Sequence, residues 1–156
     1  MQLHLPASEE KLSAYAALVL RLALAAVMIA HAMAKLLLFT LPGTAAFFAA
    51  HGFPGWSAYP VFALELLGGL LLALGFAVRP VAALLIPVML GALLVHLPNG
   101  WMFTAPNGGW EYPAFLIAAL AAQFLLGNGA LALASAACAR TRTCKAPAAL
   151  NPADGN

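Results

Sequence analysis

Five ionisable residues that could do chemistry lie within or beside apolar stretches of this chain: His31, Lys35, Glu65, His96 and Glu111. Histidine and carboxylate side chains exchange protons, and a lysine ammonium balances negative charge. A charged side chain at the centre of a bilayer costs about 2.5–3.5 kcal/mol on insertion scales, so such residues are site candidates. The pattern fits two interpretations, a polar ligand pocket or a buried ion pair with hydrogen-bonded histidines that fixes helix register.

The composition indicates that the solvent around these residues is lipid. Of the 156 residues, 64% are hydrophobic and 8% are charged, and the mean hydropathy is +0.94. Ordinary soluble domains carry about 25% charged residues, which is enough polar surface to face water. The net charge of +2 gives no reason to expect nucleic acid as a partner. We therefore predict an integral membrane protein.

Four apolar stretches have the length of membrane spans, at residues 13–39, 59–78, 80–97 and 112–134. A helix that crosses a bilayer needs about 20 mostly apolar residues. Each span must be a helix, because lipid cannot satisfy open backbone groups. The fold class predicted is all-α, an integral membrane four-helix bundle.

The first stretch also has features of a cleaved signal peptide. Residues 32–34 read Ala-Met-Ala, an A-x-A cleavage pattern. The apolar run continues past this site to Phe39, however, and Arg21 interrupts the run where a signal peptide carries no charge. We therefore favour a first transmembrane helix over a cleaved leader or a buried soluble helix.

The basic residues predict the orientation of the spans. Cytoplasmic loops are enriched in lysine and arginine, and tryptophan is enriched at membrane interfaces. Basic residues precede the first span (Lys11), separate the second from the third (Arg79) and follow the fourth (Arg140, Arg142 and Lys145). The other two loops have no lysine or arginine, and they hold every tryptophan: Trp56, Trp101 and Trp110. We expect both termini to be cytoplasmic, in a multi-pass protein of a bacterial-type plasma (inner) membrane.

In this orientation the five candidate residues share the outer half of the bilayer, on four different spans. His31 and Lys35 are i,i+4 neighbours on one helix face. Glu65 shares its face with Gly68 and Gly69, which allow close helix approach. Arg21 lies in the inner half of the first span.

The remaining segments carry weaker signals. We expect residues 1–12 to be a cytoplasmic N-terminal segment, residues 13–134 to form the membrane domain, and residues 135–156 to be a disordered cytoplasmic tail. The spacing of Cys138 and Cys144 matches no zinc or thioredoxin motif, so we expect plain thiols, with a disulfide or redox pair as the alternative. Gln123 is expected to donate a hydrogen bond to another helix.

Several stretches together resemble the DoxX family over residues 16–134. RLALAAVMIAHAMAKL (21–36) resembles its first-span signature, and ALELLGGLLLALGFAVRPVAALLIPVM (63–89) is similar to its second and third spans. HLPNGWMF (96–103) and NGGWEYP (107–113) resemble its histidine and its later glutamate–tyrosine pair. The chain departs from the family pattern at Ala32, where glycine is common, and at Asn128, where proline is frequent.

The resemblance implies a four-helix membrane protein related to the small membrane subunit of an archaeal thiosulfate:quinone oxidoreductase. The resemblance also implies that ten residues occupy motif positions of the family: Arg21, His31, Lys35, Glu65, Gly68, Gly69, Arg79, His96, Glu111 and Tyr112. Of these, Arg21, Arg79 and Tyr112 are expected to have supporting roles. The activity of most family members is unsettled, so the resemblance does not decide whether this chain is an enzyme.

The leading functional hypothesis is a quinone-linked membrane redox subunit, an oxidoreductase with quinone as acceptor. The chain has no flavin, nicotinamide or iron–sulfur motif, so the hypothesis requires a diffusible quinone or a redox partner subunit; a second copy of the chain is another partner to consider. The alternative is a non-enzymatic protein that binds or transports a small molecule, anion or proton, or that assists assembly of a membrane complex. The least favoured interpretation is haem ligation by His31 and His96, or a metal held by the histidines and glutamates.

Overall fold

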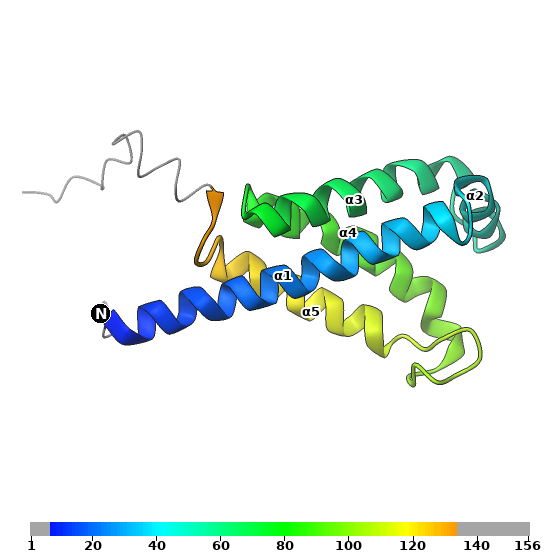
Figure 1. The fold of residues 1–156 in the computed structure, drawn as a ribbon. Coiled ribbons are helices and arrows are strands. Elements are labelled where there is room, and N and C mark those ends of the chain that lie inside the picture. Colours follow the sequence, from blue (N-terminus) through cyan, green and yellow to red (C-terminus); the bar gives the residue numbers. More distant parts are fainter. Residues whose placement is uncertain (1–6, 134–156) are drawn as a thin grey trace, which may run out of the picture.

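The computed structural model describes residues 7–133 (Figure 1). The secondary-structure elements assigned within this range are all helices. Five α-helices and two short 3-10 helices follow one another along the chain: α1 (Ala7–Leu37), α2 (Leu41–Ala50), η1 (Gly55–Ser57), α3 (Ala58–Leu74), α4 (Val78–His96), η2 (Leu97–Asn99) and α5 (Glu111–Leu126). The predicted fold class is therefore confirmed at the level of an all-α protein.

Three helical segments are long and apolar enough to cross a membrane: Ser8–Leu37, Gly55–Leu74 and Val78–Asn99. They correspond to α1, α3 and α4, which overlap the first three predicted spans. The 31-residue α1 is about 46 Å long at 1.5 Å per residue, well beyond the roughly 30 Å hydrocarbon core. It begins at Ala7, before the predicted start of the first span at residue 13.

The prediction of four helices missed α2. Its ten residues are too few to cross a bilayer, and the apolar run that continues from the first span hides its start. The Thr40 side chain accepts a hydrogen bond from the Gly43 backbone N–H at 3.2 Å, and Pro42 occupies the first turn. These are ordinary helix-start features, so the chain turns at Thr40 and begins a new helix.

The fourth predicted span is shorter than expected. The helix α5 has 16 residues and ends at Leu126, whereas the prediction ran to about residue 134. Gly127 and Gly129 both have positive φ angles, +79° and +69°, which suit glycine and stop the helix. The chain then folds back on α1, where the Ala130 N–H donates to the Ala14 carbonyl at 2.9 Å.

The helices pack around an apolar core. The helix α1 packs extensively on α3, α4 packs on α5, and further contacts join α3 with α4 and α1 with α5. At Gly69 the helix α3 approaches α1 closely, since a Cβ there would lie 2.7 Å from Ile29 Cγ1. The largest apolar side chains of the core come from all four of these helices: Leu24, Met28, Leu72, Leu85, Met89, Leu116 and Leu120.

Candidate functional site

The candidate site lies at the end of the bundle that carries α2 and residues 97–110, which we call the loop end (Figure 1). Lys35 of α1 donates to both carboxylate oxygens of Glu65 of α3, at 2.9 Å to Oε1 and 2.7 Å to Oε2. The side chain of Glu65 is 2% exposed and that of Lys35 is 16% exposed. The two residues form a part-buried ion pair in which the lysine contacts both oxygens of a buried carboxylate, and it joins two helices that are separate in sequence.

Local structure explains why these two residues meet. Lys35 lies in the last turn of α1, where the helix dipole favours a cation. Glu65 lies on the buried face of α3 together with Gly68, Gly69 and Leu72. Because Gly69 lets the two backbones approach, the lysine side chain reaches the carboxylate without a long extension across lipid.

His31 connects the same helix to α5. It lies one turn from Lys35 on α1 and is half-buried, and its ring centroid is 5.9 Å from that of Tyr112, with the planes inclined at 31°. The helix α1 therefore contacts α3 through Lys35 and α5 through His31. We call His31, Lys35, Glu65 and Tyr112 the polar cluster.

His96 and Glu111 make their hydrogen bonds elsewhere, to the segment 97–110. His96 Nδ1 lies 3.1 Å from the carbonyl oxygens of both Asn107 and Gly108, and Glu111 Oε1 accepts from the Phe103 backbone N–H at 3.1 Å. Within residues 7–133, no hydrogen bond or ion pair links either residue to Lys35 or Glu65. All five predicted residues lie toward the loop end, but only the polar cluster joins helices directly.

Sequence reasoning missed Asn99, which supports the same segment. Its Nδ2 donates to the carbonyl oxygens of Asn107, at 3.3 Å, and Gly108, at 2.8 Å. His96 contacts the same two carbonyls. Two side chains that follow one another at the end of α4 and in η2 therefore hold residues 107 and 108 in place. The Pro-Asn-Gly stretch at 98–100 is a turn signal that pointed to this role.

Arg21 and Arg79 lie at the opposite end of the bundle and hold the end of α5. Arg21 is 1% exposed and donates from Nη1 to the Asn128 carbonyl, and its Nε has no partner among the described residues. Arg79 donates to the Leu125 carbonyl at 3.4 Å. Both guanidinium groups therefore contact carbonyls at or just beyond a helix C-terminus, where cations are favourable.

Gln123 corrects one sequence expectation. Its side chain is fully buried, but Nε2 donates to the carbonyl of Gly127, just after its own helix, at 2.8 Å. The expected hydrogen bond to another helix is therefore wrong. Because α5 ends at Leu126 and not near residue 134, the carbonyl of Gly127 is free of the helix and within reach of the glutamine side chain.

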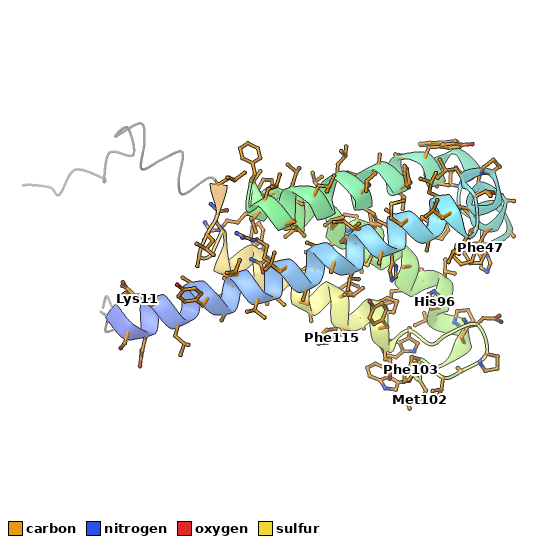
Figure 2. The ribbon with its side chains drawn as sticks, viewed as in Figure 1. Lys11, Phe47, His96, Met102, Phe103 and Phe115 are labelled. Carbon is orange, nitrogen blue, oxygen red and sulfur yellow. The ribbon has the colours of Figure 1, made fainter. Side chains whose placement is uncertain are left out.

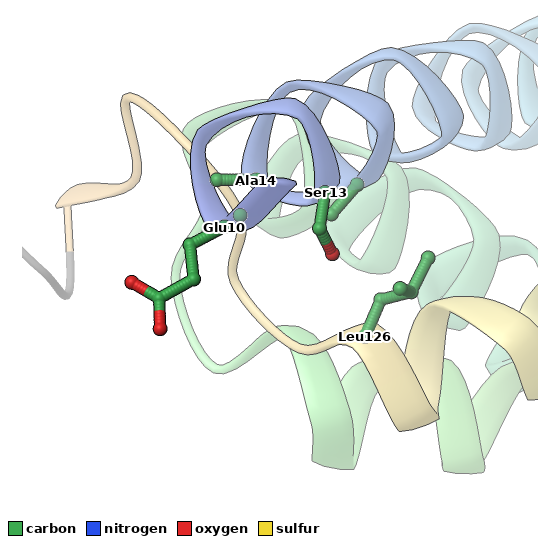
Figure 3. A pocket seen from close by; sticks show the side chains of 6 residues that line it. Glu10, Ser13, Ala14 and Leu126 are labelled. Atoms are coloured by element: carbon green, nitrogen blue, oxygen red, sulfur yellow. The ribbon is translucent and has the colours of Figure 1, made fainter. Parts of the chain in front are cut away.

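A cavity of about 340 Å³ also lies at the end opposite the loop end (Figure 3). It is lined by Glu10, Ser13, Ala14, Ala17, Leu126 and Gly129. Ala17 and His31 are separated by about 21 Å along α1, at 1.5 Å per residue. This cavity is consequently distinct from the polar cluster.

The sequence model of the DoxX family matches residues 16–97. This chain belongs to the DoxX family. A curated relative described as "Putative oxidoreductase CatD", from Bacillus subtilis (strain 168), is 34% identical over 94 residues, which is 60% of this chain. The aligned region spans 66% of the relative's length. No solved structure matches the chain.

The DoxX match covers part of the polar cluster. It includes His31, Lys35 and Glu65, together with His96, whereas Tyr112 lies beyond it. Together with the three long apolar helices, family membership establishes a DoxX-like membrane protein.

Metal ligation has no geometric support in the part of this DoxX protein that the structure describes. No group of three or more His, Cys, Asp or Glu side chains there could hold a metal ion. Cys138, Cys144 and the tail from residue 135 lie outside the described residues, so the expectations for them are untested.

Proposed function

We propose that this DoxX-family protein is a quinone-linked subunit of a membrane redox complex. The observation that carries the proposal is the part-buried Lys35–Glu65 pair with His31 and Tyr112 beside it, at one end of an apolar helix bundle. Intramembrane ionisable groups mark functional sites by default. The description of the relative CatD as a putative oxidoreductase supports the oxidoreductase class.

The polar cluster has the chemistry that a quinone headgroup requires. Reduction of a quinone to a quinol takes up two electrons and two protons at its two carbonyl oxygens. The Lys35 ammonium is a hydrogen-bond donor, and His31 and Glu65 are proton-exchanging groups. The ion pair is neutral overall, which suits a neutral headgroup, and the surrounding apolar helices suit an isoprenoid tail. The electrons come from a partner subunit in this proposal.

We also propose that α1, α3, α4 and α5 cross a bacterial-type plasma membrane, with both termini and residues 1–12 and 135–156 in the cytoplasm. Lys11 and Arg79 lie at the N-terminal ends of α1 and α4, at the end opposite the loop end. Trp56, Trp101 and Trp110 lie at the loop end. This distribution supports the positive-inside orientation with the polar cluster in the outer half.

The apolar core favours a one-sided binding site over a transport path. The buried side chains of Leu24, Ala25 and Met28 lie on α1 between Arg21 and the polar cluster, and core residues from α3, α4 and α5 pack against them. An ion or proton crossing this layer would meet apolar side chains without polar partners, which is costly.

Quinone binding by the purified protein tests the proposal. The protein is isolated in mild detergent, bound quinone is extracted and identified by mass spectrometry, and a quinone analogue is titrated while thermal unfolding is followed. We expect co-purified quinone and a stabilising analogue, with both effects lost in Glu65→Gln and Lys35→Met and retained in the control Glu10→Gln. Absence of extractable quinone together with no analogue effect refutes the proposal.

The same variants separate the quinone proposal from the non-enzymatic alternative. Proteoliposome flux of a small anion or proton that requires Lys35 and Glu65 but no redox partner would favour a transport function. A protein that neither binds quinone nor supports such flux leaves the ion pair as a structural element that fixes the register of α1 and α3.

A further inference from the structure

The segment 97–110 at the loop end is an ordered structure built from main-chain hydrogen bonds. Trp110 N–H donates to the Gly100 carbonyl and Glu111 N–H to the Trp101 carbonyl, each at 3.1 Å. The Trp101 and Trp110 rings pack edge to face, with centroids 4.3 Å apart. At Gly109 an added Cβ would collide with the carbonyl oxygens of residues 100–102, so the two sides of the loop are in direct contact.

This ordered loop presents apolar side chains outward. Met102 is 54% exposed and Phe103 is 65% exposed, and the segment from Leu97 to Trp110 contains no Lys, Arg, Asp or Glu. Contiguous exposed apolar patches mark binding surfaces for protein or membrane. We therefore expect the exposed side chains of Met102 and Phe103 to be covered by a protein or by the membrane.

The position of Phe103 indicates which partner covers it. Its N–H is bound by Glu111 at 3.1 Å, and Phe115 lies one turn from Glu111 on the same face of α5. Phe115 is 67% exposed on an apolar helix. Figure 2 shows Met102, Phe103 and Phe115 along one edge of the molecule. The loop tip thus continues the lateral apolar face of α5 beyond the end of the helix.

The geometry points to Met102 and Phe103 as an interfacial anchor that inserts into the lipid surface at the loop end. Its occupant is the acyl-chain and headgroup boundary of the same bilayer that surrounds α5. The anchor holds segment 97–110, and with it the contacts of His96 and Glu111, at a set depth. This inference rests on the proposed crossing of the membrane by α5 but not on quinone binding, so it and the quinone proposal can fail separately.

Site-directed spin labelling in vesicles of phosphatidylethanolamine and phosphatidylglycerol tests the anchor. In the full chain with Cys138→Ser and Cys144→Ser, a label is attached through Phe103→Cys, which keeps the main-chain N–H that Glu111 binds. The matched control is Asn107→Cys, an exposed polar position on the other side of the loop. If Phe103→Cys does not fold, Met102→Cys takes its place.

We expect the label at 103 to collide more with oxygen than with a water-soluble nickel chelate, and the label at 107 to show the reverse preference. Equal behaviour of the two labels, with nickel favoured at both, overturns the inference, because the tip then lies in water. Shielding of the label at 103 from both reagents, with dipolar broadening between labels, also overturns it, because a second copy then covers the tip.

Discussion

Lys35 Nζ lies 2.7 Å from Glu65 Oε2, and this contact joins the last turn of α1 to the buried face of α3. One turn back along α1, the His31 ring faces Tyr112 of α5. A single helix therefore brings a charged pair and an aromatic pair to the same end of an apolar bundle. The consequences of this arrangement can be measured without knowing the ligand.

Removing one partner of the ion pair is expected to be more damaging than removing both. A lone charge left in a buried site costs about 3–5 kcal/mol, whereas replacement of the whole pair is often close to neutral. Lys35→Met and Glu65→Ala should therefore each lower the midpoint of thermal unfolding in detergent, and the double variant should recover most of the loss. Strict additivity of the two single effects would show that the pair is not coupled in the folded protein.

The close approach of α1 and α3 at Gly69 is expected to determine how strongly Lys35 and Glu65 are coupled. Gly69→Ala would place a Cβ 2.7 Å from Ile29 Cγ1 and 3.2 Å from the Ala25 carbonyl oxygen, and overpacking of this kind costs about 1–3 kcal/mol. We expect lower thermal stability and a weaker Lys35–Glu65 coupling in a double-mutant cycle.

The matched control for this substitution is Gly91→Ala on α4. An added Cβ at Gly91 meets nothing within 4 Å, and alanine is the better helix former by roughly 0.8–1.0 kcal/mol. Gly91→Ala should leave stability unchanged or raise it. Equal losses at both glycines would mean that helix contact at Gly69 is not the cause.

Glu111 is expected to order segment 97–110 through its side-chain oxygen rather than its charge. Glu111→Gln keeps an oxygen that can accept from Phe103 N–H, while Glu111→Ala removes it. Hydrogen exchange of the amides in residues 100–108 should accelerate in Glu111→Ala and change little in Glu111→Gln. Unchanged exchange in both variants would place the order of the loop in its main-chain contacts alone.

The sequence predicted the parts of this fold that follow from hydrophobic length. The long apolar runs correspond to α1, α3 and α4, and the i,i+4 spacing of His31 and Lys35 placed both on one face. The opposite charges of Lys35 and Glu65 made their pairing a natural expectation once both lay at one depth.

Other features depend on local geometry that hydropathy does not report. The helix α2 begins at an N-cap residue inside an apolar run, so only the residues from Thr40 to Pro42 indicate where it starts. Equal depth likewise does not imply contact: His96 and Glu111 hydrogen-bond to segment 97–110, whose path is set by the tight crossing at Gly109. The hydropathy pattern predicts which residues lie toward the same end of the helices, but it does not predict the path of a loop.

Arg21 is expected to hold the segment after α5 against α1. Its buried guanidinium lies against Gly75 and donates to the part-buried Asn128 carbonyl, so Arg21→Met leaves that carbonyl without its partner, at a cost of about 1–3 kcal/mol. Hydrogen exchange and proteolysis should increase in residues 127–133 and stay unchanged at the loop end.

Arg79→Met is the control, because this exposed arginine makes one 3.4 Å contact to the end of α5. Its effect on the free energy of unfolding should lie within about 0.5 kcal/mol of zero. If both variants loosen residues 127–133 equally, the burial of Arg21 contributes nothing beyond the charge that the two residues share.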